Sequence, residues 1–232
     1  MSKKTLFALL VVLLVVLAPY TILPALLESV VARAFQSQLG LEHRPEVEVE
    51  SAPAPTMYAG SFSKALVSAE GVGVRGVKTK KVVMELDPFD LNILESVTGG
   101  KVSTEQPLSG KLDVELSEDN ISRLAQVGSG VPVQGVELED GQVVLTMASG
   151  LGVPVTVRGR LLLQNGLLVF EPQQVEQAPG LVSTEQVLAL TRFSYPAGML
   201  PYGGKITGVE VRKDSLTLSG EIKKIPLEGP IG

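Results

Sequence analysis

The stretch that decides the fold is VPVTVRGRLLLQNGLLVF, residues 153–170. From Val153 to Leu163 apolar residues and Gly159 occupy alternate positions, and mostly polar residues fill the other face. This period of two predicts a β-strand with one buried face. Its eleven residues would span about 36 Å, roughly twice the usual strand length. Because Gly permits bends and Pro belongs at edges or bulges, Gly159 and Pro154 predict a strongly twisted, curved sheet.

Two dipeptides predict tight hairpin turns, Asn165-Gly166 within this stretch and Asp140-Gly141 before it. Turns at these positions bring apolar residues opposite one another in both hairpins. A slip of one residue would move them to the other face, so the register is well specified. The expected pairs are Leu163 with Leu168, Leu161 with Phe170, Leu138 with Val143, and Val136 with Leu145.

Alternation of the same kind recurs along the chain from residue 46 onward, whereas helical signals there are few. Short helices are expected after Asp87-Pro88, at Ser117, and at Ser183, where Ser183 and Gln186 match a capping box. No linker divides this region. The sequence therefore predicts an α+β fold, a single domain in which a long, strongly twisted antiparallel sheet curves around one or more helices. Further expected strand faces are Val47 and Val49; Val82, Met84 and Leu86; and Leu112, Val114 and Leu116.

The N-terminus has the pattern of an export signal. Lys3 and Lys4 precede an unbroken apolar run over residues 6–18, and apolar character resumes up to Leu27. A helix over residues 6–27 is long enough to cross a hydrocarbon core of about 30 Å. We favour an uncleaved signal anchor, a transmembrane helix over residues 1–27, above a cleaved leader, because Pro19 follows the plausible cleavage position. Both alternatives leave the body on the extracytoplasmic side, periplasmic or at the cell surface.

Residues 28–40 continue with apolar residues at helical spacing and end at Gly40. This amphipathic helix either packs on its own domain or forms a stalk or membrane-surface helix that continues the anchor. Residues 41–228 form the β-rich body.

Composition excludes most enzyme chemistries. The chain has no cysteine and one histidine, His43, so thiolate nucleophiles, disulfides and multi-histidine metal sites are absent. A net charge of −5 and 4% aromatic residues argue against a nucleic-acid partner. We therefore expect no catalytic residue, no metal and no cofactor.

Four weak motifs have simpler interpretations. A match to S-x-x-K at Ser61–Lys64 lacks its companion elements, and the match to G-x-G-x-x-G at residues 71–76 precedes a β-type segment where a dinucleotide site needs a helix. Acidic residues near Asp140 lack the spacing of a calcium loop. Lysines could attract anionic headgroups, although an ordinary charged sheet face is the simpler interpretation; they are Lys78, Lys80, Lys81, Lys223 and Lys224.

The C-terminal third carries a family resemblance. Residues 161–172, LLLQNGLLVFEP, are followed by LPYGGKITGVEV over residues 200–211 and by LTLSG over residues 216–220. With a β segment at residues 47–51 and a G-x-F element at Gly60-Ser61-Phe62, this pattern resembles the LmeA-like family of bacterial envelope phospholipid-binding proteins. The resemblance covers roughly residues 26–227. It implies an extracytoplasmic phospholipid-binding domain, distantly like tubular lipid-binding folds in which a curved sheet cradles a helix, and it supplies no catalytic residue.

The long apolar strand faces could hold a lipid. Each CH₂ that leaves a bilayer costs about 0.8 kcal/mol, so a chain of about 16 carbons needs on the order of 10 kcal/mol of replacement contacts. The same faces could equally form a closed core. We expect a membrane-anchored lipid-binding protein; the alternative is a scaffold for another envelope protein. The expected lipid-lining residues are Leu112, Val114, Leu116, Val155, Val157, Leu161, Leu163, Leu168 and Phe170.

Overall fold

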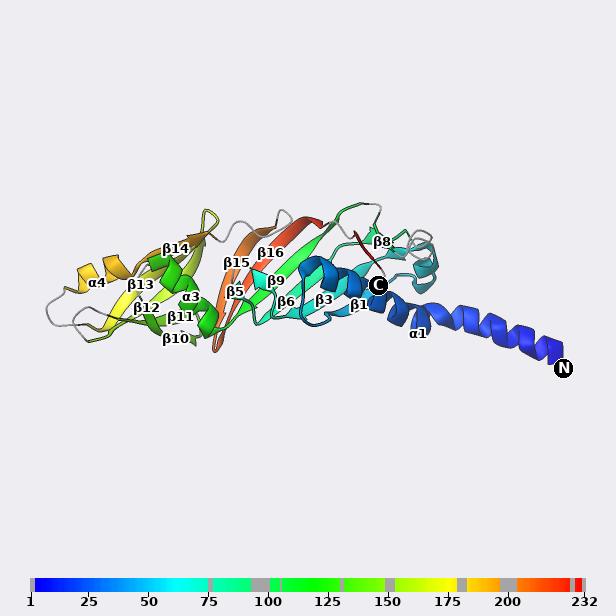
Figure 1. The fold of residues 1–232 in the computed structure, drawn as a ribbon, viewed down its shortest axis with the longest axis horizontal. Coiled ribbons are helices and arrows are strands. Elements are labelled where there is room, and N and C mark those ends of the chain that lie inside the picture. The colour runs from blue at the N-terminus through cyan, green and yellow to red at the C-terminus, as the bar shows by residue number, and fades with distance from the viewer. Residues whose placement is uncertain are drawn as a thin grey trace. The chain divides into compact units, whose positions relative to one another are not determined.

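A computed structural model of the chain describes residues 3–74, 77–92, 101–104, 106–129, 132–148, 153–178, 183–196, 204–225 and 228–230. The chain divides into two compact units, and Figure 1 labels the helices and strands of both. Three of the four boundaries between these units fall inside strands, and the single domain expected over residues 41–228 stays a prediction. Unit 1 comprises Met1–Glu70, Val83–Lys111 and Lys223–Gly232, and unit 2 comprises Gly71–Val82 and Leu112–Ile222.

Six strands form the larger sheet, in the order β1-β3-β6-β9-β16-β15. The pairings of β1 with β3 and of β15 with β16 are antiparallel. Alternate residues are buried along β1, β6 and β9, as the period of two predicted. The strands are β1 (Glu46–Glu50), β3 (Lys64–Glu70), β6 (Lys81–Leu86), β9 (Leu108–Leu116), β15 (Lys205–Arg212) and β16 (Ser215–Ile225).

A second sheet of five strands, in the order β10-β11-β12-β13-β14, lies within unit 2 and is antiparallel throughout. All four expected cross-strand pairs are confirmed, including Leu161 with Phe170 and Leu138 with Val143. The stretch quoted first forms β12 and the start of β13. The strands are β10 (Val133–Glu139), β11 (Gln142–Met147), β12 (Val155–Gln164), β13 (Leu167–Gln177) and β14 (Phe193–Pro196).

Three further pairs of short strands complete the described β structure: β17 (Glu228–Pro230) with β8 (Lys101–Ser103), β2 (Ser61–Phe62) with β7 (Phe89–Asp90), and β4 (Gly73–Val74) with β5 (Val77–Lys78). A 3₁₀ helix, η1, spans Ala54–Ala59. The helix expected after Pro88 is wrong at its start, because Phe89–Asp90 pairs as a strand; residues 93–100 lie outside the described residues.

Helix α1 runs without interruption over Lys3–Leu39, across both the expected anchor and the expected amphipathic helix. Val31, Ala34 and Phe35 are buried, and α1 contacts β1 within unit 1, so this part of the helix packs on its own domain. Among the residues that the structure describes, no helix combines the length and hydropathy needed to cross a membrane. The membrane-spanning helix expected at residues 1–27 is therefore not confirmed.

Two shorter helices belong to unit 2, α3 (Glu118–Ser129) and α4 (Thr184–Thr191). Both begin where the sequence predicted. The capping box of α4 is confirmed, because Ser183 Oγ accepts the N–H of Gln186 and the Gln186 side chain accepts the N–H of Ser183.

Candidate lipid-binding site

One face of the five-stranded sheet is apolar across all five strands. Partners in an antiparallel ladder share a face, so the register places Leu145 of β11 beside Val157 of β12, and Leu161 of β12 beside Phe170 of β13. Phe193 of β14 continues this row, with its ring stacked on that of Phe170 at a centroid separation of 5.4 Å. We call this the inner face. Its residues are Val136, Leu138, Val143, Leu145, Met147, Val155, Val157, Leu161, Leu163, Leu168, Phe170 and Phe193.

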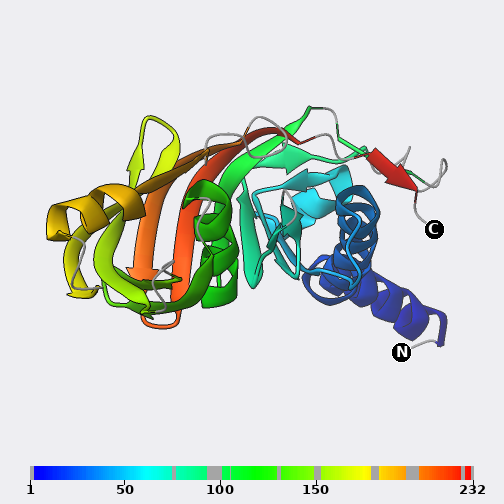
Figure 2. The same ribbon diagram turned by 60° about the vertical axis from the view of Figure 1, so that its left-hand side comes forward.

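Helix α3 shows that this sheet is curved. The helix contacts both β10 and β14, which are the two outermost strands of the sheet. Four strand spacings of about 4.8 Å separate those strands along a flat sheet, a width of about 19 Å. Figure 2 shows the sheet curling around α3, which brings both edge strands to the helix. The curved sheet around a helix that the sequence predicted is confirmed in unit 2.

A close backbone approach at Gly159 accompanies this curvature. A Cβ atom at this position would lie 2.5 Å from the carbonyl oxygen of Glu171 and 2.7 Å from the ring of Phe170. The β12–β13 register shifts between Arg158 and Gly159. Gly159 therefore lets the Phe170 ring lie over the strand where any larger residue would displace it.

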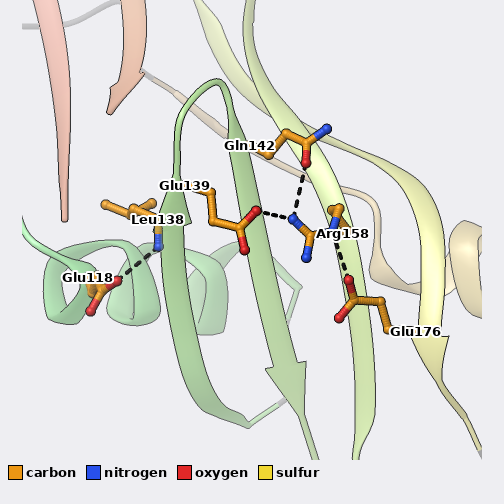
Figure 3. A network of polar contacts seen from close by, with 6 residues as sticks. All are labelled: Glu118, Leu138, Glu139, Gln142, Arg158 and Glu176. Atoms are coloured by element: carbon orange, nitrogen blue, oxygen red, sulfur yellow. Dashed lines mark hydrogen bonds and ion pairs between the residues drawn. The ribbon is translucent and has the colours of Figure 1, made fainter. Parts of the chain in front are cut away.

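The first turn of α3 is held by hydrogen bonds to other elements. Glu118 Oε1 accepts the N–H of Leu138 on β10 at 2.9 Å (Figure 3), and Asn120 Nδ2 donates to the carbonyl oxygen of Lys78 on β5 at 2.7 Å. Asn120 Oδ1 also accepts the N–H of Ser117 at 2.9 Å, which caps the helix. Further along, Ile121, Leu124 and Ala125 are buried, in keeping with contacts to β10 and β14.

The opposite face of the sheet carries a polar network around Arg158 of β12 (Figure 3). Its guanidinium donates to Glu139 on β10, to Gln142 on β11 at 3.1 Å, and to Glu176 on β13 at 2.7 Å. The hydrogen bond that Arg158 donates to Glu139, followed by the one that it donates to Glu176, raises the pKa of Arg158. Arg158 therefore stays protonated and links three neighbouring strands on the face away from α3.

The nine residues expected to contact lipid fall into two groups. Val155, Val157, Leu161, Leu163, Leu168 and Phe170 lie together on the inner face, whereas Leu112, Val114 and Leu116 lie on β9 of the other sheet. Seven of the nine are buried, and Val157 and Phe170 have no exposed surface. Only Val155 and Leu163 are half-buried. Contact of these residues with lipid stays a prediction.

The β11 and α3 parts of this site were not predicted from the sequence. Val143 and Leu145 are expected on one hairpin face, but the prediction did not use Ser149-Gly150, a turn-forming dipeptide in the segment that connects this hairpin to β12. The apolar side of α3, with Ile121 and Leu124, was recognised as helical without a place in the fold. The strand order of the structure places β11 beside β12, and the contacts of α3 place this helix against β10 and β14 of the same sheet.

The weak motifs of the sequence have structural roles. Ser61 Oγ donates to Asp90 at 2.5 Å and Lys64 Nζ lies 3.2 Å from Glu85, so the two S-x-x-K residues have separate carboxylate partners. Within the glycine-rich segment Gly73–Val74 forms β4, which pairs with β5 at Val77–Lys78, where a dinucleotide site would need a helix. Glu139 pairs with Arg158, and Asp140 accepts the N–H of Lys213 at 3.1 Å.

Comparison with known proteins gives one match. A family model described as LmeA-like phospholipid-binding matches residues 19–221, which include α3 and the whole five-stranded sheet. Searches of curated proteins and of solved structures returned no match. The matched region covers most of the chain and agrees with the resemblance seen in the sequence, and the chain therefore belongs to the LmeA-like phospholipid-binding family.

Proposed function

We propose that the protein binds a phospholipid with an acyl chain held between the inner face and α3. The observation that carries this proposal is the inner face itself, an apolar surface of five strands curled around one amphipathic helix in a member of a phospholipid-binding family. A curved apolar face offers an extended chain contacts along its whole length, and it holds no buried ionisable group that a chain would have to displace.

The closed arrangement implies an exchange of contacts. Val157 and Phe170 have no exposed surface, so the atoms around them already belong to the protein. A chain of about 16 carbons brings on the order of 10 kcal/mol of apolar contact free energy. This free energy is similar to that of burying a few apolar side chains, so the acyl chain can take the place of Leu124 and its neighbours on α3. Lipid binding is thus an exchange of one apolar partner for another.

The proposal includes attachment to the extracytoplasmic side of a membrane. Its support is the sequence, in which Lys3 and Lys4 precede the apolar run of residues 6–18. In this role the protein binds a phospholipid of the cell envelope and catalyses no reaction on it. A protein partner from the envelope is the alternative role that the experiment below distinguishes.

The test is photocrosslinking of the full chain in vesicles of phosphatidylethanolamine and phosphatidylglycerol that contain a phospholipid with a diazirine on one acyl chain. Mass spectrometry then maps the crosslinked peptides. We expect crosslinks on β11, β12 and β13. Crosslinks within residues 1–27 serve as the internal measure of membrane exposure.

Two neighbouring residues provide a matched pair of variants. Leu162 and Leu163 are both half-buried on β12 and lie on opposite faces. Leu163→Trp fills space on the inner face, so it should lower crosslinking there several-fold, whereas Leu162→Trp should not. Equal yields from both variants, or crosslinks restricted to residues 1–27, would overturn lipid binding. Stoichiometric recovery of one envelope protein with no crosslinked lipid would support the scaffold role.

A further inference from the structure

In unit 1 the chain returns along α1 toward the apolar part of that helix. Just after α1 ends, the N–H of Leu41 donates to the carbonyl oxygen of Gln36 at 3.0 Å, and near the end of β1 the backbone nitrogen of Val49 lies 3.5 Å from Glu28 Oε1. Gln36 and Glu28 are about 12 Å apart along the helix axis. The end of β1 therefore lies beside Glu28, on the side of α1 that leads to its N-terminus.

The loop between β1 and β3, residues 51–63, begins at this end of the sheet. The N–H of Ser63 donates to the carbonyl oxygen of Glu50 at 2.9 Å, so the loop leaves the sheet and returns to it at the same place. Helix η1 lies within the loop and contacts α1. Because the loop extends beyond the end of β1, this contact lies on the side of Glu28 that leads to the N-terminus of α1. We call this part of the molecule the η1 end of unit 1.

Both segments that meet at the η1 end are uncharged over long stretches. Helix α1 has no charged residue between Lys4 and Glu28, and the loop has none between Glu50 and Lys64. Neither segment therefore carries a side chain whose charge would have to be removed from water on contact with a bilayer.

Tyrosine and apolar side chains are exposed in these segments. Tyr58 of η1 is 48% exposed, and Tyr20 and Leu26 of α1 are 61% and 59% exposed. A carboxylate also reaches the loop from β7, where Asp90 accepts the hydroxyl of Ser61 at 2.5 Å. Exposed tyrosines between an apolar segment and polar groups are typical of a membrane–water interface, because the ring meets the apolar side and the hydroxyl meets the hydrated side.

The other end of the β1–β3 pair is charged. Glu42, His43 and Arg44 precede β1, Glu46 begins it, and all four are exposed. Because Glu46 pairs with Ser68, the exposed Glu70 that ends β3 lies at this same end. The two ends of the pair thus differ in the property that decides whether a surface can rest on lipid.

We propose that the η1 end of unit 1 rests in the headgroup layer of a phospholipid bilayer, where Tyr58 anchors it beside the point at which α1 enters the membrane. This inference rests on the membrane attachment included in the proposed function, and it adds the face of unit 1 that meets the bilayer. The bilayer is the occupant because the uncharged segment of α1 continues up to Glu28 at this same end. Since Glu28 lies against Val49, no linker separates that segment from the sheet.

Tryptophan fluorescence tests this contact, because the chain has no Trp and one introduced Trp is then the single reporter. Full-length Tyr58→Trp is reconstituted in vesicles of phosphatidylethanolamine and phosphatidylglycerol whose acyl chains carry bromine atoms near the headgroup. The matched control is His43→Trp, at an exposed position before β1. We expect the bromine atoms to quench Tyr58→Trp several-fold more strongly than His43→Trp, and acrylamide, which quenches from water, to give the reverse order.

Two further reporters make the outcomes distinguishable. Ala59→Trp probes the neighbouring exposed residue of η1, so the result does not depend on one substitution, and Tyr20→Trp reports the insertion of α1. Lipid quenching of Tyr20→Trp without quenching of either η1 reporter would overturn the docking of the η1 end and leave membrane attachment intact. Absence of lipid quenching from Tyr20→Trp as well would overturn the attachment itself.

Two other results would also contradict the docking of the η1 end. Equal lipid quenching of Tyr58→Trp and His43→Trp would show that the two ends of the β1–β3 pair do not differ in their contact with the bilayer. Protection of both η1 reporters from acrylamide without lipid quenching would show that protein, a second copy of this chain in these vesicles, covers the surface. Inner-face crosslinking in unit 2 is measured separately, so none of these results changes the test of lipid binding.

Discussion

Each unit contains a helix whose glutamate accepts a backbone N–H from an edge strand. In unit 1, Glu28 of α1 lies 3.5 Å from the N–H of Val49 on β1, and in unit 2, Glu118 of α3 lies 2.9 Å from the N–H of Leu138 on β10. The two glutamates differ in their position within the helix. Glu28 lies well inside a long helix, close to its buried residues, whereas Glu118 is the first residue of a short one.

This difference separates a helix held mainly by packing from one held at one end. In α1 the buried Val31, Ala34 and Phe35 follow Glu28 directly, and the N–H of Leu41 donates to Gln36 beyond them. In α3 the short hydrogen bonds of Glu118 and Asn120 fix the first turn. A helix fixed by directional bonds at one end and by apolar packing elsewhere can exchange that packing for another apolar partner. This property suits α3 to the proposed function.

The largest expected effects come from the aromatic residues buried in each unit. Phe35→Ala in α1 and Phe170→Ala in β13 should each destabilise by about 3–5 kcal/mol, because each removes a ring that is almost fully buried. Phe170→Ala also removes the stacking on Phe193. Hydrogen exchange followed by mass spectrometry locates the effect. Phe35→Ala should accelerate exchange in α1 and β1, and Phe170→Ala in β12 to β14.

The comparison between the units would fail if each substitution accelerated exchange equally in both. Leu190→Ala is the control, because Leu190 is 71% exposed on α4 and its truncation should change neither pattern.

A smaller effect is expected at the fixed end of α3. Asn120 is 7% exposed, and Asn120→Ala removes both the cap on Ser117 and the donor to the Lys78 carbonyl oxygen. Loss of a cap and of a buried hydrogen bond should cost about 1–3 kcal/mol. Exchange should rise first at residues 117–121 and then along α3. If only the last turn of α3 responded, its first turn would not be the fixed end.

The two glutamates provide the next test. Glu118→Gln keeps an acceptor oxygen but loses the charge beside the N-terminus of α3, which should cost about 0.5–1 kcal/mol. Glu28→Gln should cost less, because its contact is longer and lies far from the N-terminus of α1. Exchange at the Leu138 and Val49 amides reports each bond separately. A larger loss of protection against exchange at the Val49 amide than at the Leu138 amide would contradict this prediction.

The sequence predicted the hairpins of this fold because local chemistry decides them. Asn165-Gly166 and Asp140-Gly141 select two-residue turns, and in both cases the period of two then leaves one register. The capping box at Ser183 was equally local. These features need only a few residues that are adjacent in the chain.

The arrangement of the site depended on contacts between distant segments. Nothing near Glu118 indicates that its carboxylate meets Leu138, and β9 alternates like β12 although the two strands belong to different sheets. Leu112, Val114 and Leu116 were therefore grouped with residues of another sheet. The helix expected after Pro88 failed for the same reason, since Phe89 and Asp90 pair with β2, a partner 27 residues away or more.

The smallest expected effect lies on the outer faces, where each unit has an ion pair between strands. In unit 1, Lys64 of β3 lies 3.2 Å from Glu85 of β6, whereas in unit 2 Arg158 bonds to residues on three strands. Arg158→Lys loses the planar fork that reaches several partners, so exchange in β12 should rise slightly, and more than exchange in β3 rises for Lys64→Met. About 1 M salt should narrow this difference in exchange between the two variants, because salt screens ion pairs.

The pH dependence of β12 tests the same network. Because the pKa of Arg158 is raised, the stability that its charge contributes is lost only as pH rises through that raised pKa, so exchange in β12 should not change at neutral and mildly alkaline pH. A loss of protection in β12 within that range would show that another group, and not the arginine, holds these strands together.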